Sequence, residues 1–102
     1  MYLLLEWTNP KEEERNKRRY KHLRENQWPY RERKLKEGVK WDILDLTDGT
    51  GRMWALHTFD TIEDFDKVWN DDEYKKLMSQ YSYFVDDCSL RILRGTKKLE
   101  PK

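Results

Sequence analysis

Hydrophobic and polar residues alternate on both sides of a glycine-rich turn in the middle of the chain. The alternating runs cover residues 39–47 and 52–59, and the turn between them has glycine at two of its four positions. Alternation with a period of two is typical of β-strands, and glycine accepts the positive φ angles that tight hairpin turns need. The pattern therefore predicts a β-hairpin.

A turn centred on residues 49–50 fixes which side chains of this hairpin lie together. In that register Asp42 lies opposite His57 on one face. The other face then carries Trp41, Ile43, Asp45, Arg52, Trp54 and Leu56. Both faces are largely apolar, and a chain of 102 residues has helices enough to cover only one of them. The second cover is most simply another copy of the chain, so we expect a homodimer that associates through its sheet.

The rest of the pattern predicts two more strands and two helical stretches. Strands are expected at residues 2–8 and 88–94, one helical stretch after Asn9 that Pro29 ends or kinks, and another after Thr61 that breaks at residues 70–72. Asn9 and Thr61 have side chains that commonly cap helix N-termini. The order β-α-β-β-α-β predicts an α+β ferredoxin-like fold, with a four-stranded antiparallel sheet and two helices on one face.

This ferredoxin-like unit is expected to be a single domain over residues 1–95. Residues 96–102 are rich in lysine and contain a proline, so we expect a frayed C-terminal tail there.

The charged residues are unevenly distributed along the chain. Charged side chains make up 40% of the sequence, against about 25% in an ordinary domain. Residues 11–40 hold twelve Lys or Arg and six Glu, whereas residues 41–90 hold four Lys or Arg and twelve Asp or Glu. This pattern favours two complementary solvated surfaces. The alternative is nucleic-acid binding by the basic first helix, although the strands lack the signature of RNA-binding modules of this order.

Several classes of protein are disfavoured by what the sequence contains. Cys88 is the single cysteine, which excludes an internal disulfide and suits a reducing cytoplasmic location. No stretch approaches the roughly 20 apolar residues of a membrane span. His22 has no second ligand at helical spacing, and the turn glycines precede a strand rather than a helix. We therefore expect no metal, no phosphate-binding loop and no cofactor.

The predicted Asp42–His57 pair is the strongest candidate for catalysis. A carboxylate that is hydrogen-bonded to an imidazole orients the ring and raises its basicity, as a general base requires. The alternative is a structural cross-strand pair. On the other face, Trp41, Trp54 and Arg52 are candidates for binding a planar ligand. The alternative role of the two tryptophans is packing in the core or at the dimer interface, and that of the arginine is a salt bridge.

Three stretches of the sequence resemble the dimeric α/β-barrel superfamily, in the branch that includes the NIPSNAP-like, EthD-like and antibiotic-biosynthesis-monooxygenase-like proteins. They are residues 48–56, 59–65 and 69–74, where a strand ends in an aromatic residue, a cap follows, and the second helix breaks at an acidic turn. The resemblance implies a homodimer whose two sheets form a barrel, with a small apolar ligand site between sheet and helices. The haem-degrading members carry a histidine on the second helix, and residues 61–83 contain none, so haem is disfavoured.

The functional hypothesis is a homodimeric α/β-barrel protein that binds a small apolar or aromatic ligand. A cofactor-independent monooxygenase-like enzyme is one form of this hypothesis. The alternatives are a structural or regulatory homodimer without catalysis, and a nucleic-acid-binding protein. The sequence leaves the substrate and the existence of any reaction open.

Overall fold

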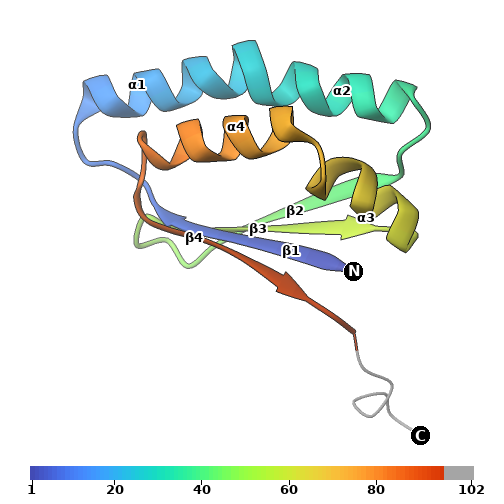
Figure 1. The fold of residues 1–102 in the computed structure, drawn as a ribbon. Coiled ribbons are helices and arrows are strands. Elements are labelled where there is room, and N and C mark those ends of the chain that lie inside the picture. Colours follow the sequence, from blue (N-terminus) through green and yellow to red (C-terminus); the bar gives the residue numbers. More distant parts are fainter. Residues whose placement is uncertain (96–102) are drawn as a thin grey trace, which may run out of the picture.

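A four-stranded antiparallel β-sheet carries all the helices on one of its faces and leaves the other face uncovered (Figure 1). The computed structural model describes residues 1–95, and the expected tail at residues 96–102 lies outside them. The elements are β1 (Tyr2–Thr8), α1 (Glu13–His22), the π-helix η1 (Leu23–Gln27), α2 (Trp28–Lys36), β2 (Trp41–Thr47), β3 (Arg52–Phe59), α3 (Ile62–Trp69), α4 (Asp72–Ser82) and β4 (Asp86–Leu93). The strands lie in the order β2-β3-β1-β4, and each is antiparallel to its neighbours. The expected α+β fold with an antiparallel sheet is confirmed.

β1 lies between β3 and β4, and its alternation decides which side chains enter the core. Leu3, Leu5 and Trp7 are each at most 6% exposed and share the face that packs against the helices. The buried residues form two clusters, one around Leu3 and Trp41 and the other around Trp7 and Tyr81. The two ends of the sheet therefore have separate apolar cores against the helices.

α1, η1 and α2 form one continuous helical segment, which runs along the top of Figure 1. At its middle the Trp28 N–H donates to the carbonyl of Leu23, five residues earlier, which is the π-helical pattern. Pro29 follows at once; it has no N–H, and its ring would crowd the carbonyl four residues before it. The wider π turn makes room for this proline. Pro29 therefore neither ends nor sharply breaks the helix, contrary to one reading of the sequence.

The predicted helix caps have different outcomes. Thr61 caps α3, because its Oγ1 accepts the Asp64 N–H at 3.1 Å, and Asp71 caps α4 after the predicted break. Asn9 caps nothing. Its Oδ1 instead accepts the indole N–H of Trp7 at 2.9 Å, and α1 begins later, at Glu13. The buried indole needs an acceptor at the end of β1, and Asn9, two residues further along the chain, supplies it.

The predicted hairpin is present, but its predicted register was wrong by one residue. Thr47 pairs with Met53, so five residues, 48–52, separate the last paired positions instead of four. Thr47 closes this loop: its Oγ1 accepts the Gly49 N–H at 3.1 Å and donates to the Arg52 carbonyl at 3.0 Å. Gly49 and Gly51 both have positive φ. Because side chains alternate with a period of two, a slip of one residue reverses the face of one strand relative to the other.

The oppositely charged halves of the chain meet where the first helical segment packs on α4 and the start of β4. Ion pairs join Arg15 to Asp86 at 2.6 Å, Lys34 to Asp71 at 3.1 Å and Arg33 to Glu73 at 2.5 Å. Such surface pairs contribute little stability each. Their arrangement supports the complementary-surface interpretation of the charge pattern.

Candidate functional site

A cavity of about 290 Å³ lies between the sheet and the helical segment and has walls from both core clusters. Strands β1, β2 and β3 form its floor, and α1, η1, α2 and α4 form its roof. This volume is near the lower end of about 300–1,000 Å³ for small-molecule sites. Its most deeply buried wall residues include Leu5, Trp7, Trp41, Ala55, Tyr74 and Tyr81. The walls are therefore largely apolar and rich in aromatic rings.

His57 lies on the floor of the cavity, in contact with Trp41 on the neighbouring strand. The indole Nε1–H of Trp41 donates to His57 Nδ1 at 3.0 Å, and the two rings are 5.7 Å apart. An Nδ1 that accepts a hydrogen bond carries no proton, so the neutral imidazole holds its proton on Nε2. His57 thus presents a hydrogen-bond donor at Nε2.

Burial, together with the charge of Arg31, lowers the pKa of His57 to about 4. The side chain is 6% exposed, so the charged form has little access to water. At neutral pH the ring is uncharged and its free nitrogen is a donor. This arrangement is suited to polarising or binding a ligand oxygen, and it leaves no nitrogen free to accept a proton.

Three buried polar atoms of the cavity wall have no hydrogen-bond partner. They are Gln27 Oε1, Arg31 Nε and the hydroxyl of Tyr74. No other buried side-chain nitrogen or oxygen of residues 1–95 lacks a partner. An unsatisfied buried polar group disfavours the folded state by about 1–3 kcal/mol. All three residues line one cavity, so the simplest explanation is that their unpaired atoms serve a ligand or ordered water there.

Two exposed aromatic residues of the cavity wall flank the π turn, Tyr20 in α1 and Trp28 at the start of α2. Tyr20 is 50% exposed and Trp28 is 51% exposed, and their rings meet edge to face at 6.4 Å. Both therefore lie where the cavity opens to solvent. π-Helical turns occur frequently at functional sites, where they redirect side chains of a helix. Here the turn also ends at Gln27, one of the residues with an unpaired polar atom.

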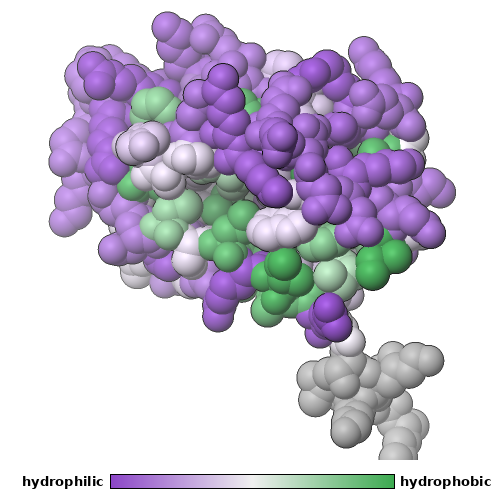
Figure 2. Space-filling model, viewed as in Figure 1, coloured by the Kyte–Doolittle hydropathy of each residue, from purple (hydrophilic) through white to green (hydrophobic). Residues whose placement is uncertain are grey.

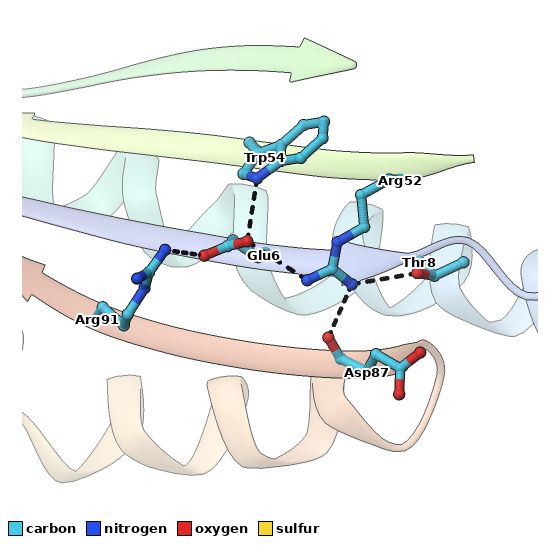
Figure 3. A network of polar contacts seen from close by, with 6 residues as sticks. All are labelled: Glu6, Thr8, Arg52, Trp54, Asp87 and Arg91. Carbon is cyan, nitrogen blue, oxygen red and sulfur yellow. Dashed lines mark hydrogen bonds and ion pairs between the residues drawn. The ribbon is translucent and has the colours of Figure 1, made fainter. Parts of the chain in front are cut away.

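The uncovered face of the sheet has a separate polar network centred on Glu6 of β1 (Figure 3). Its carboxylate accepts hydrogen bonds from Arg91, from Trp54 Nε1 at 3.1 Å and from Arg52 at 3.4 Å. Burial alone would raise the pKa of Glu6, but these donors outweigh it and hold the pKa below the ordinary value. Arg52 also donates to Thr8 Oγ1 at 3.1 Å and to the Asp87 carbonyl at 3.0 Å.

The structure separates the five site residues predicted from the sequence. His57 and Trp41 both line the cavity. Asp42 pairs with Thr58 on the uncovered face, so the predicted Asp42–His57 pair is wrong; Ile43 occupies the position opposite His57. Arg52 and Trp54 also lie on the uncovered face, bonded to Glu6. The expected grouping of Trp41 with these two residues is therefore wrong, for the same reason of register.

The polar residues of the cavity that the sequence does not single out include Gln27, Arg31, Tyr74 and Arg19. A partial signal existed for Gln27, a polar residue that continues the spacing of Tyr20 and Leu23 on the helical stripe. Arg31 carries no comparable signal, and Tyr74 carries only the helical spacing that it shares with Leu77, Met78 and Tyr81. Arg31 and Tyr74 belong to α2 and α4, and only the packing of those helices brings them together.

Within the part of the chain that the structure describes, no three His, Cys, Asp or Glu side chains come close enough to hold a metal ion. None of the described helices has the length and apolar character needed to cross a bilayer. No known family, curated protein or solved structure matches this chain.

The unpaired Tyr74 hydroxyl gives a direct test of the cavity geometry. Tyr74 is 3% exposed, and replacing it with Phe removes a buried group that has no partner, so we expect the free energy of unfolding to rise by about 1 kcal/mol. Tyr30 is the matched control, because its ring is 6.1 Å from that of Tyr74 while its hydroxyl donates to Asp71 at 2.8 Å. Tyr30→Phe is expected to lower stability by about 1.5–3 kcal/mol. Urea unfolding measures both, and two losses of similar size would contradict the assignment.

Proposed function

We propose that this chain is a ferredoxin-like domain that works as a homodimeric small-molecule-binding protein, with the ligand between sheet and helices of each subunit. The strand order and the placement of all helices on one sheet face support this fold assignment. A dimeric α/β barrel is the form of assembly that this assignment implies. The single cysteine is consistent with a reducing cytoplasm.

The observation that carries the proposal is the concentration of unsatisfied buried polar atoms in one apolar cavity. Specific ligand sites combine apolar walls with a few polar groups that fix orientation. The cavity here has that composition, with Gln27, Arg31 and Tyr74 contributing the unpaired atoms and His57 a further donor. A purely structural core would gain stability by losing these groups.

The uncovered sheet face supports association with a second copy. Leu44 and Leu46 of β2 are 56% and 47% exposed. Leu56 of β3 pairs with Leu44, and Leu4 of β1 pairs with Leu56 on its other side. In the side view of Figure 2, hydrophilic side chains cover most of the helices, and hydrophobic surface appears lower down, at the level of the strands. An apolar face of this kind on a soluble domain marks an interaction site.

The charges on the uncovered sheet face also favour its association with the same face of a second copy of the chain. Glu6 lies among Arg91 and Arg52, so one face carries both signs of charge. A two-fold interface places each patch against its own equivalent, and a face with both signs can form complementary contacts in that arrangement. We therefore propose a sheet-to-sheet dimer.

Binding is the role that the cavity supports better than base catalysis. A cofactor-independent oxygenase that begins by removing a substrate proton needs a proton acceptor in its site. His57 Nδ1 already accepts the Trp41 N–H, which leaves Nε2 as a donor. The monooxygenase-like form of the proposal would therefore require another base, and we assign His57 the role of positioning the ligand.

Nucleic-acid binding has less support. Arg15, Arg33 and Lys34 of the basic helical segment are paired with carboxylates of the second half of the chain, which reduces the charge left for phosphates. The discriminating observation is a strongly salt-dependent affinity for an oligonucleotide, which the cavity proposal does not predict.

The cavity proposal is tested with a neutral aromatic probe, naphthalene carboxamide, by isothermal titration calorimetry. Ala55→Phe should remove binding, because Ala55 is 4% exposed on the cavity floor and a phenyl group there fills the space. Leu44→Phe adds the same ring on the uncovered face and should leave binding unchanged. Equal affinity of the probe for both variants would contradict a site in the cavity.

A further inference from the structure

The polar groups of the cavity are not balanced between donors and acceptors. Arg31 Nε is a donor only, His57 Nε2 is a donor in the tautomer that Trp41 enforces, and the hydroxyl of Tyr74 is free to donate. Gln27 Oε1 is the single unpaired acceptor among these atoms. A ligand that satisfied them would therefore need more acceptors than donors.

The three donors gather around one indole ring. Trp41 has its ring centroid 5.8 Å from the guanidinium carbon of Arg31, 5.7 Å from the His57 ring and 6.1 Å from the Tyr74 ring. Arg31 is held in place because its Nη2 donates to the Trp41 carbonyl at 2.5 Å. The donors thus come from β3, α2 and α4 and share one end of the cavity.

This end of the cavity is positively charged. Arg31 forms no ion pair with any carboxylate of residues 1–95. Its charge acts on His57, where it helps to lower the pKa. Arg19 and Asp45 line the cavity at its other end, beside Tyr81, where Arg19 donates to the Tyr81 hydroxyl at 3.4 Å. Burial raises the pKa of Tyr81 to about 12, although the contact with Arg19 opposes this effect. The cavity therefore has a cationic end at Trp41, and both an arginine and a carboxylate toward Tyr81.

The walls between these ends favour a flat molecule. Trp41, Tyr74, Trp7 and Tyr81 all line the cavity, and each is at most 6% exposed. Aromatic rings pack best against other planar π-systems, in offset or edge-to-face contact. Arg31 itself lies over the Trp41 ring, as guanidinium groups do beside aromatic faces.

We propose that the cavity binds a planar conjugated organic acid, whose carboxylate is held by Arg31 Nε, His57 Nε2 and the Tyr74 hydroxyl. This inference rests on the proposed binding function and specifies the class of ligand. The acid group accepts the three donors beside Trp41. A hydroxyl or N–H on the remainder of the molecule donates to Gln27 Oε1.

The neutral analogue of such a ligand should bind more weakly for a definite reason. A carboxamide fits the same space, but it presents an N–H₂ group to donors and leaves the charge of Arg31 uncompensated. Hydrogen bonds to charged groups contribute enough to change a dissociation constant by about ten-fold to a hundred-fold. A cation of the same shape should be excluded by repulsion from Arg31.

The test compares naphthalene carboxylate with naphthalene carboxamide by isothermal titration calorimetry at low salt. Wild-type protein should bind the acid at least about ten-fold more tightly than the amide. Arg31→Gln should remove this preference by weakening the acid alone. Arg24→Gln is the matched control, since Arg24 is an exposed residue of η1 that does not line the cavity, and it should change neither affinity.

Tyr74→Phe provides a second, milder variant that keeps the shape of the cavity. It should weaken the acid about ten-fold while the protein melts at a higher temperature, so a loss of affinity cannot be ascribed to unfolding. Equal binding of acid and amide by wild-type protein overturns this inference and leaves the proposed function standing. If neither probe binds, both this inference and the proposed function are overturned. An acid preference that survives Arg31→Gln overturns the role of Arg31.

Discussion

Replacing Leu56 with Glu is expected to convert the protein from a dimer to a monomer without unfolding it. Leu56 lies on the uncovered sheet face between Leu4 of β1 and Leu44 of β2. It is half-buried within a single chain, so the monomer can turn the carboxylate toward water. In a sheet-to-sheet dimer the same carboxylate would be enclosed among leucine side chains.

The expected weakening of the dimer is large because a two-fold interface contains the substitution twice, once in each chain. An unpaired buried charge typically disfavours a state by about 3–5 kcal/mol, and a two-fold interface contains the substitution in both chains. We therefore expect the dissociation constant of the dimer to rise by at least about a thousand-fold, which corresponds to about 4 kcal/mol. Sedimentation velocity over a range of protein concentrations measures this shift.

Ile62→Glu is the matched control for the dimer experiment. Ile62 is also an apolar surface residue, 59% exposed, but it begins α3 on the helical side of the sheet. A glutamate there is favourable for the helix dipole, so neither folding nor association should suffer. Wild-type protein that sediments as a monomer, or Leu56→Glu protein that remains dimeric, would refute the sheet-to-sheet arrangement. Circular dichroism of each variant verifies that the fold is retained.

The elements that the sequence predicted well are those with local causes. Alternation along residues 2–8 puts Leu3, Leu5 and Trp7 on one face of β1, and the structure buries that face. The caps at Thr61 and Asp71 depend on a side chain and an N–H a few residues away, and both are present. Such short-range hydrogen bonds are encoded in neighbouring residues and need no knowledge of the tertiary structure.

The hairpin register could not be predicted because it depends on the conformation of one loop. A four-residue and a five-residue loop both fit a sequence with glycine at positions 49 and 51. The Thr47 hydroxyl decides between them by closing the longer loop. The resulting shift of one residue in register puts Asp42 on the face opposite His57. Trp41, instead of Asp42, then lies beside His57.

The cavity was predicted only in outline, because its polar groups come from separate elements. Arg31, His57 and Tyr74 are far apart in the sequence and meet only when α2 and α4 pack over β3. Hydrophobic periodicity describes one face of one element at a time, so it does not detect such a convergence. The π turn that places Gln27 at the cavity is equally hidden, since it reflects how the helix accommodates Pro29.

The burial of His57 predicts a loss of stability on mild acidification. The pKa of His57 is about 4 in the folded chain against 6.5 for the exposed side chain. Above pH 6.5 both states hold a neutral ring and the effect is absent. Between pH 6.5 and pH 4 the unfolded chain takes up a proton that the folded chain does not, so unfolding becomes progressively more favourable. The full difference in pKa corresponds to a loss of about 3 kcal/mol in the free energy of unfolding, at about 1.36 kcal/mol for each pKa unit.

His57→Gln isolates this contribution. A glutamine can accept the Trp41 N–H and does not titrate, so its free energy of unfolding should fall less than that of the wild type between pH 6.5 and pH 4.5. Arg31 is the charged neighbour that, after burial, helps to lower the pKa of His57. Urea unfolding at constant protein concentration measures the stability at each pH.

His22→Gln is the control, because His22 is also 6% exposed and its pKa is also lowered by burial. It lies outside the cavity, where Nε2 contacts the Leu77 carbonyl at 3.2 Å, a bond that opposes the effect of burial. The pH dependence should therefore flatten more in His57→Gln than in His22→Gln. A slope that is unchanged in His57→Gln would show that His57 is accessible to protons in the folded chain. The neutral donor that the cavity presents to its ligand would then be lost as well, because the same burial keeps the ring uncharged.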